Sequence, residues 1–322
     1  MSSLYFLGID VGSVSTNLVI TDDDDRVIKK MYLRTSGRPI AVLAAGLREL
    51  KGEFASKNIG GVGTTGSGRQ LAAVITGADV VKNEITAHAV ASQKAVPDVR
   101  TILEIGGQDS KIILLRNGVV VDFAMNTVCA AGTGSFLDRQ AARLEIPIEE
   151  FGGYALRAKM PTRIAGRCAV FAESDMIHKQ QTGHGNEDII AGLCEALVRN
   201  YLSNLAKGKD IEEPVMFQGG VAANVGIKTA FEKALKKKLV IPEHHEVMGA
   251  IGVALLAKNA ARHGLKTHFA GFDAACRDYI TRSFECSGCP NCCEIIEITC
   301  LGAICAHFGD RCGKWSNLSV AV

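Results

Sequence analysis

The sequence predicts an α/β protein whose body consists of two related halves and is followed by a cysteine-rich tail. Strand-like apolar segments alternate with helical ones, as in α/β domains. A short motif occurs twice, and of the 11 cysteines only Cys129, Cys168 and Cys194 precede residue 265. We therefore expect a first lobe at 1–94 completed by a helix at 247–264, a second lobe at 95–246, and a tail at 265–322.

The first lobe begins with segments that predict three antiparallel strands, at 5–12, 16–23 and 26–34. The acidic run "TDDDDR" between the last two is a solvated turn. A helix is expected at 39–54, and "IGGVGTTGSGRQL" at 59–71 predicts a strand leading into a glycine-rich turn.

An internal repeat relates the two lobes. The segment "IDVGSVSTNLVI" at 9–20 aligns without gaps with "LEIGGQDSKIIL" at 103–114. Asp10 falls on Glu104 and Asn17 on Lys111. Each copy is expected to be a tight turn between two antiparallel strands, so the chain is predicted to contain two copies of one supersecondary unit.

Such a turn is suited to binding phosphate. Glycine lets the backbone approach a ligand, hydroxyl and amide groups donate to phosphate oxygens, and an acid at a strand end can hold Mg²⁺ or orient a water. One hairpin alone is more often an ordinary turn, but two could hold a nucleotide from both sides. A third segment, at 215–235, predicts a strand, a Gly219–Gly220 turn and a helix that begins at 222–224. The two glycines allow close approach of an adenosine or its α-phosphate.

Two cysteines precede predicted helices. Cys129 lies ahead of "SFLDRQAARL", and Cys168 lies ahead of a helix near "FAESDMIHKQ". Helix N-termini favour thiolates and anionic clusters. A [4Fe-4S] cluster normally takes four thiolates, so two per chain predict a cluster shared by a homodimer. The alternative is that both are small buried residues, as we expect for Cys194.

Composition limits the remaining classes. The formal net charge is only +2, which does not indicate nucleic-acid binding. The longest apolar runs are too short to span a bilayer, and the start of the chain lacks the features of a signal peptide. We expect a cytoplasmic protein with reduced thiols and with neither nucleic acid nor membrane as a partner.

The tail contains a second group of cysteines. Cys286, Cys289 and Cys292 are separated by two-residue gaps, which can place three sulfurs around one metal ion. A ferredoxin-type fourth cysteine would fall at Ile296. We expect a small zinc or iron-sulfur knuckle, with reduced surface thiols as the alternative.

Nine segments between residues 4 and 262 resemble, in order, the activators of 2-hydroxyacyl-CoA dehydratases and the related benzoyl-CoA reductase ATPase subunits: "LGIDVGSVSTN", "TTGSGR", "NEITAHA", "EIGGQDSK", "NTVCAAGTGSFLD", "RCAVFAESDMI", "DIIAGLCEALVRN", "FQGGVAANVG" and "MGAIGVALLAK". The resemblance implies the actin-like fold shared with sugar kinases and heat-shock chaperones, with ATP in the cleft between two ribonuclease H-like lobes. It also implies that Cys129 and Cys168 bind the shared cluster.

The activity implied by the resemblance is ATP-driven, one-electron reduction of a partner iron-sulfur enzyme, with ferredoxin or flavodoxin as electron donor. The partner could be a dehydratase, a benzoyl-CoA reductase-type enzyme or a double-cubane protein. Two other functions remain open: a small-molecule kinase, which would have no use for Cys129 and Cys168, and a filament or scaffold ATPase.

The candidate site residues serve ATP, ADP and Mg²⁺. Asp10 is expected to hold Mg²⁺ through water, and either Glu104 or Asp109 orients the hydrolytic water. The phosphate hairpins comprise Gly12, Ser13, Ser15, Thr16 and Asn17 in the first copy, and Gly106, Gly107, Gln108, Asp109 and Lys111 in the second. Gly132 and Gly134 are expected to bring amides toward the nucleotide, and Gly219 and Gly220 to contact the adenosine.

Overall fold

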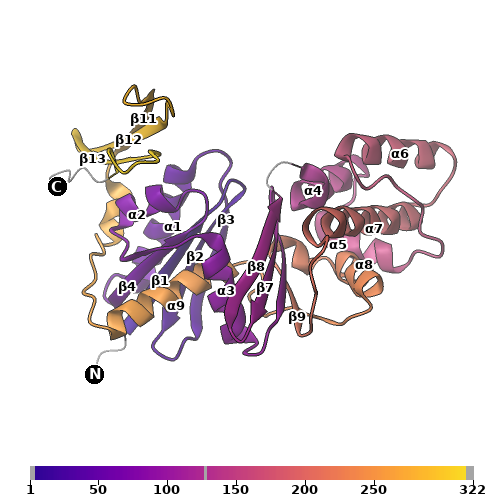
Figure 1. Cartoon of the computed structure of the whole chain (residues 1–322), viewed down its shortest axis with the longest axis horizontal. Helices are drawn as coiled ribbons and strands as arrows, with labels where there is room; N and C mark the ends of the chain where they lie inside the picture. Colours follow the sequence, from indigo (N-terminus) through magenta and orange to yellow (C-terminus); the bar gives the residue numbers. More distant parts are fainter. Residues whose placement is uncertain (1–3, 127–128, 317–322) are drawn as a thin grey trace. The chain divides into compact units, whose positions relative to one another are not determined.

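The computed structural model describes residues 4–126 and 129–316 and divides into two compact units (Figure 1). Unit 1 comprises Met1–Asn83 and Gly249–Val322, and unit 2 comprises Glu84–Met248. Thr127 and Val128, part of the motif around Cys129, lie outside the described residues.

Unit 1 is built on a five-stranded sheet with the order β3-β2-β1-β4-β5. The β1, β2 and β3 strands are antiparallel neighbours, whereas β4 is parallel to β1. The elements of its body are β1 (Leu4–Val11), β2 (Ser15–Asp22), β3 (Val27–Arg34), α1 (Pro39–Phe54), β4 (Asn58–Thr65), α2 (Arg69–Thr76), β5 (Val80–Val81) and α9 (Met248–Arg262). The three strands and the helix predicted near the N-terminus are confirmed.

Small residues bring α9 directly onto this sheet. A Cβ atom at Gly8 in β1 would lie 1.9 Å from the carbonyl oxygen of Ala250, and one at Gly63 in β4 would lie 2.2 Å from that of Val253. Any larger residue would push the helix away from the strands. The first turn of α9 is therefore held beside the end of β1.

The tail begins inside the core of unit 1. Phe272 and Ala275 in the short 3₁₀ helix η3 (Phe272–Cys276) pack among the buried side chains of α1, α2 and the sheet. An ion pair of 2.5 Å joins Lys51 to Asp273. The remaining tail forms a three-stranded antiparallel sheet, β11-β12-β13. Its strands are β11 (Tyr279–Glu285), β12 (Glu294–Cys300) and β13 (Ala303–Phe308).

Unit 2 has a second five-stranded sheet with the order β10-β9-β6-β7-β8. This order reproduces that of unit 1 when β6 is matched to β1, including the parallel pairing of β6 with β9. The predicted duplication is therefore confirmed. The elements are α3 (Glu84–Ala95), β6 (Thr101–Ile105), β7 (Ser110–Arg116), β8 (Val119–Asn126), η1 (Ala130–Gly132), α4 (Gly134–Arg143), α5 (Ile148–Leu156), α6 (Ala169–Gln181), α7 (Asn186–Leu205), β9 (Val215–Gln218), η2 (Gly220–Ala223), α8 (Val225–Leu235) and β10 (Leu239–Val240).

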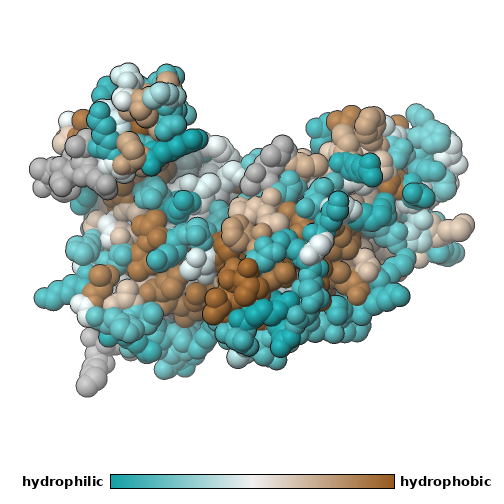
Figure 2. Space-filling view, in the orientation of Figure 1, coloured by the Kyte–Doolittle hydropathy of each residue, from teal (hydrophilic) through white to brown (hydrophobic). Residues whose placement is uncertain are grey.

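The core of unit 2 lies around α7. Cys194 in this helix is 1% exposed and belongs to that core, as expected from its helical spacing. The edge strand β8, by contrast, exposes apolar side chains at alternate positions, including Val119 and Phe123, and Figure 2 shows apolar surface where this strand runs. Among the described residues, no helix is long and apolar enough to cross a membrane.

Candidate functional site

The two predicted hairpins share one register. Asp10 lies opposite Asn17 in the β1–β2 pair, and Glu104 lies opposite Lys111 in the β6–β7 pair. The turns also match, because the amide of Gly12 donates to the Ser15 carbonyl at 2.8 Å and that of Gly106 to the Asp109 carbonyl at 3.0 Å. The ungapped alignment of the two segments is thus an alignment of equivalent positions in space.

In unit 1, the Asp10 carboxylate lies where two glycines leave room for it. A Cβ atom at Gly66 would lie 2.5 Å from Asp10 Oδ1, and one at Gly249 would lie 2.2 Å from Oδ2. Gly66 also has a φ of +88°, which other residues rarely adopt. The turn after β4 and the start of α9 therefore both depend on glycine to accommodate this carboxylate.

The residues of the first hairpin divide between two faces. Asn17 lies on the face of Asp10, and its Nδ2 is 3.5 Å from Ser15 Oγ. Its Oδ1 is buried without a hydrogen-bond partner among the described residues, which is unusual for a buried oxygen. This oxygen is available to accept a hydrogen bond from a ligand. Thr16 occupies the opposite face because side chains alternate along a strand. Its hydroxyl is buried against that of Thr35, at 3.0 Å, so the structure does not bring Thr16 together with Asp10.

In unit 2, Lys111 lies at the centre of three carboxylates. Its ammonium is 2.7 Å from Glu84, 3.0 Å from Asp109 and 3.1 Å from Glu104, and the lysine side chain is only 2% exposed. Although burial disfavours the charged form, the three acids hold the pKa of Lys111 well above its usual range. Glu84, at the start of α3, is not predicted as a site residue from sequence, although its motif "NEITAHA" is among those that carry the resemblance.

Glu104 is a buried carboxyl group with a shifted pKa. Burial raises the pKa of Glu104 to about 8, although the ammonium of Lys111 lowers it. One oxygen, Oε2, faces Lys111. The other, Oε1, would lie 2.8 Å from a Cβ atom at Gly219 and 3.3 Å from one at Gly106. Because both positions are glycines, Oε1 is left with open space beside it.

The Gly219–Gly220 turn follows β9 as predicted. Gly219 has a φ of +90°, and its amide donates to the carbonyl of His245 at 2.8 Å. The following helix begins later than expected, because η2 occupies 220–223 and Asn224 caps α8 by accepting from the amides of Gly226 and Ile227. Beside β9, His88 is a packed residue with Nδ1 2.8 Å from Gln218 Nε2. Burial, followed by the charge of Lys111, lowers its pKa to about 3.

The segments that carry Cys129 and Cys168 meet in unit 2. The Cys129 Sγ lies 3.8 Å from the carbonyl oxygen of Arg167, the residue before Cys168. Both thiols are half-buried. The backbone of Cys129 is held by Asn126, whose Oδ1 accepts from the Cys129 amide at 3.0 Å and whose Nδ2 donates to its carbonyl at 2.9 Å. Cys168 is the residue directly before α6, as predicted.

The surroundings of Cys129 differ from the predicted helix start. Cys129 precedes the short η1, and α4 begins only at Gly134. The first amides of α4 are already paired: those of Gly134 and Ser135 donate to the carbonyls of Gly106 and Gly107, both at 2.8 Å. Gly134 therefore binds the second hairpin through its amide. Gly132, by contrast, packs against Asn200.

Metal sites were predicted at both groups of cysteines. Within residues 4–126 and 129–316, no three His, Cys, Asp or Glu side chains are arranged to hold a metal ion. In the tail, the Cys286 Sγ accepts from Trp315 Nε1 at 3.2 Å and from the amide of Gly288 at 3.4 Å. The Trp315 hydrogen bond, with that of Gly288, lowers the pKa of the Cys286 thiol. Cys289 and Cys292 lie in the same loop between β11 and β12 and are exposed.

Comparison with known proteins supports the resemblance found in the sequence. The chain is 33% identical to the 2-hydroxyisocaproyl-CoA dehydratase activator of Clostridioides difficile, over 82% of this chain and 98% of that protein. It is 34% identical to the (R)-2-hydroxyglutaryl-CoA dehydratase activating ATPase of Acidaminococcus fermentans, over 81% of this chain and 100% of that protein.

Structural comparison agrees with the sequence. The activator of the 2-hydroxyisocaproyl-CoA dehydratase from Clostridium difficile, solved with bound ADPNP, superposes with a TM-score of 0.74 at 32% identity and covers 80% of this chain and 96% of its own. This match confirms the predicted actin-like ATPase fold. The model of the BadF/BadG/BcrA/BcrD ATPase family matches residues 7–257, which include both hairpins and both body cysteines. The chain therefore belongs to the BadF/BadG/BcrA/BcrD ATPase family.

Proposed function

We propose that this protein hydrolyses ATP to drive one-electron transfer from a [4Fe-4S] cluster, shared by two copies of the chain, to a partner iron-sulfur enzyme. The observation that carries the proposal is the approach of Cys129 to Arg167 and hence to Cys168, in the same unit as the acid-rich hairpin. Relatives named as activators of 2-hydroxyacyl-CoA dehydratases support it.

The residues around the thiols fit such a cluster. Two half-buried cysteines per chain leave two ligand positions for a second chain, since a cubane normally takes four thiolates. Cys168 lies at the N-terminus of α6, where free amides and the helix dipole favour anionic sulfur. Next to it, Val170 and Phe171 are 68% and 67% exposed, and a second copy would cover these apolar side chains. When bound, the cluster would supply a store for one electron.

For the nucleotide chemistry, we propose that Asp10 holds Mg²⁺ through water. Asn17 and Ser15 donate to phosphate oxygens from the first hairpin, and the turn at 106–108 donates from the second. Glu104 is the better candidate to orient the hydrolytic water and accept its proton, because Oε1 is open and the raised pKa suits a general base near neutral pH. Both Glu104 and Asp109 pair with Lys111, so the preference for Glu104 rests on its burial and its raised pKa.

A hydrogen-bonded connection within unit 2 can couple the two sites. The carbonyls of Gly106 and Gly107 accept from the first two amides of α4, and the chain runs back through η1 from α4 to Cys129. A shift of the hairpin on binding or losing the γ-phosphate would therefore move the segment that holds this thiol. We propose this as the route by which ATP changes the surroundings of the cluster.

The function is tested with anaerobically purified protein that has been reduced by one electron per two chains. Mixed with a purified 2-hydroxyacyl-CoA dehydratase, it should be reoxidised faster with ATP than with ADP, as followed by the electron paramagnetic resonance signal. A colourless protein that phosphorylates a small molecule, or one that polymerises with ATP, would instead support the kinase or scaffold alternatives.

We propose separately that Cys286, Cys289 and Cys292 close around a zinc ion or a second iron-sulfur site. The lowered pKa of Cys286 and its hydrogen bond from the Gly288 amide favour a thiolate at this loop. The protein is expected to release one zinc per chain to a chelator, or to show additional iron. Cys286→Ser should abolish this binding, whereas Cys276→Ser, at the exposed cysteine of η3, should leave it intact.

A further inference from the structure

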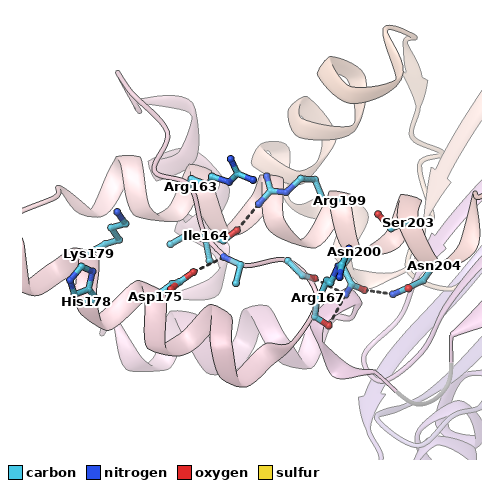
Figure 3. Close-up of a pocket in the computed structure, with 12 residues that line it drawn as sticks. Arg163, Ile164, Arg167, Asp175, His178, Lys179, Arg199, Asn200, Ser203 and Asn204 are labelled. Atoms are coloured by element: carbon cyan, nitrogen blue, oxygen red, sulfur yellow. Dashed lines mark hydrogen bonds between the residues drawn. The ribbon is translucent and has the colours of Figure 1, made fainter.

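A cavity of about 860 Å³ lies between α6 and α7 (Figure 3). Its floor is the segment 163–167, and its walls are formed by Asp175, His178 and Lys179 of α6 and by one face of α7 from Arg199 to Asn204. All the lining residues belong to unit 2. The cavity is therefore formed without any side chain from unit 1.

The cavity carries an excess of positive charge. Arg163, Arg167, Lys179 and Arg199 line it, whereas Asp175 is the only acid among its lining residues. An adjoining hollow shares Arg167 and adds Lys207. We call these five cationic residues the basic pocket. In Figure 3 the side chains of Arg163 and Arg199 extend toward the same side of the cavity.

Most of these charges are not neutralised within the chain. Arg163, Arg167 and Lys179 form no ion pair with any of the described residues. Asp175 is already bound to the floor, because its Oδ2 accepts from the amide of Ala165 at 2.8 Å. Like charges gathered in one hollow repel one another, and an anionic partner would relieve that repulsion.

The floor of the cavity leads directly to both body cysteines. Arg167 precedes Cys168, and its carbonyl oxygen is 3.8 Å from the Cys129 Sγ. Asn200 in the wall holds the same stretch, since its Nδ2 donates to the Gly166 carbonyl at 2.6 Å. A partner seated in the cavity would thus contact the backbone segment that precedes Cys168.

We propose that the basic pocket docks an acidic electron-donor protein, whose carboxylates enter the cavity and pair with its arginines and lysines. The inference rests on the proposed function and deepens it by locating the donor. One electron passes from the donor, which is oxidised, to the site held by Cys129 and Cys168, which is reduced. No bond is formed or broken in this step.

Two observations favour a protein over a small molecule in this cavity. Small-molecule sites are mostly apolar and enclose the ligand, whereas Arg163, Arg167 and Arg199 are exposed and most of the lining residues carry polar or charged side chains. Polar, charge-steered surfaces are instead typical of transient electron-transfer complexes. An acceptor protein is the competing occupant, and the comparison of ferredoxin binding with dehydratase binding distinguishes the two.

The test uses a double charge reversal, Arg163→Glu with Lys179→Glu. Neither side chain makes a hydrogen bond or ion pair with the described residues, so the fold should be retained. The groups that hold the floor, Asp175, Arg199 and Asn200, stay in place. Lys237→Glu with Lys238→Glu is the matched control, since it makes the same change in net charge and both lysines of unit 2 lie outside the basic pocket.

Binding of an oxidised, strongly acidic ferredoxin is measured first by calorimetry at low ionic strength, a readout that requires no cluster. The double variant should bind at least about tenfold more weakly than the parent, and the control should bind like the parent. Reduction by reduced ferredoxin should slow in parallel. Reduction by the methyl viologen radical, a cation, should not slow.

Equal ferredoxin affinity in all three proteins would overturn the proposal. Normal ferredoxin binding together with lost binding of a dehydratase would overturn it in favour of the acceptor. If the ferredoxin affinity falls as expected in a protein that contains no iron, the docking surface stands and the proposed cluster function fails.

Discussion

Lys111 lies directly opposite Glu104 in the β6–β7 pair, with its ammonium 3.1 Å from Glu104 Oε2. Asp10 and Asn17 occupy the equivalent positions of the β1–β2 pair. The duplicated unit thus carries an acid and an amide in one copy, and an acid and a cation in the other. This difference predicts different roles for the two copies, with Mg²⁺ near Asp10 and proton transfer at Glu104.

The first prediction concerns pH. Burial raises the pKa of Glu104 to about 8, so this acid is protonated at lower pH and becomes a base only as the pH rises. The turnover number for Mg-ATP should therefore increase through pH 8. In Glu104→Gln it should fall by about 100-fold or more and lose this inflection. If the variant retains the same pH profile, another group titrates there and Asp109 becomes the candidate base.

The second prediction concerns the buried charge cluster. Lys111→Met removes the cation that faces Glu84, Glu104 and Asp109. The acids of this cluster that are ionised are then left without a counterion. The free energy of unfolding should fall by about 3 kcal/mol, as for other buried ion pairs that lose one partner. Denaturant titration measures this loss. The exposed Lys238→Met should change stability by less than about 0.5 kcal/mol; a similar loss in both variants would show that burial of Lys111 is not the cause.

The third prediction tests the position of the Asp10 carboxylate. A Cβ atom at Gly249 would lie 2.2 Å from Asp10 Oδ2, so Gly249→Ala must displace the carboxylate. The affinity for Mg-ADP should fall by about tenfold or more, since small displacements of a positioned group have large effects. Gly52→Ala in α1 is the control because its Cβ would contact nothing within 4 Å. Unchanged affinity in Gly249→Ala would remove Asp10 from the metal site.

The fourth prediction concerns the tail. Phe272 is 7% exposed and lies in the core of unit 1, with its ring centroid 5.1 Å from that of Phe269. Phe272→Ala should lower the free energy of unfolding by about 3 kcal/mol. Leu301→Ala, at a residue that is 79% exposed, should have almost no effect. A neutral Phe272→Ala would show that the start of the tail is dispensable to unit 1.

Much of the fold could be predicted because side chains alternate strictly between two faces along the strands of the repeated hairpin. Strands place side chains on alternate faces, so aligning Asp10 with Glu104 also aligns Asn17 with Lys111. The same alternation bears on the phosphate contacts that were predicted for the first hairpin. Thr16 and Asn17 are adjacent and therefore face opposite sides of the sheet, although both were expected to contact phosphate.

Other features depend on residues distant in sequence. Glu84 reaches Lys111 from a different element, and no local pattern encodes that contact. The cysteine-rich composition of the tail concealed the fact that Phe272 joins an apolar core formed mainly by residues 7–75. The pairing of the first α4 amides with Gly106 and Gly107 likewise requires the three-dimensional packing of two loops.

The central claim is that Cys129 and Cys168 from two chains hold one cluster, and the most direct measurement is the iron content per dimer. Iron, sulfide and molar mass are determined anaerobically on Cys286→Ser/Cys289→Ser protein, so that the tail adds no iron. We predict a dimer with about four irons, falling to nearly none after the further change Cys129→Ala. A monomer that carries a full cluster, or a Cys129→Ala protein that keeps its iron, would contradict the account.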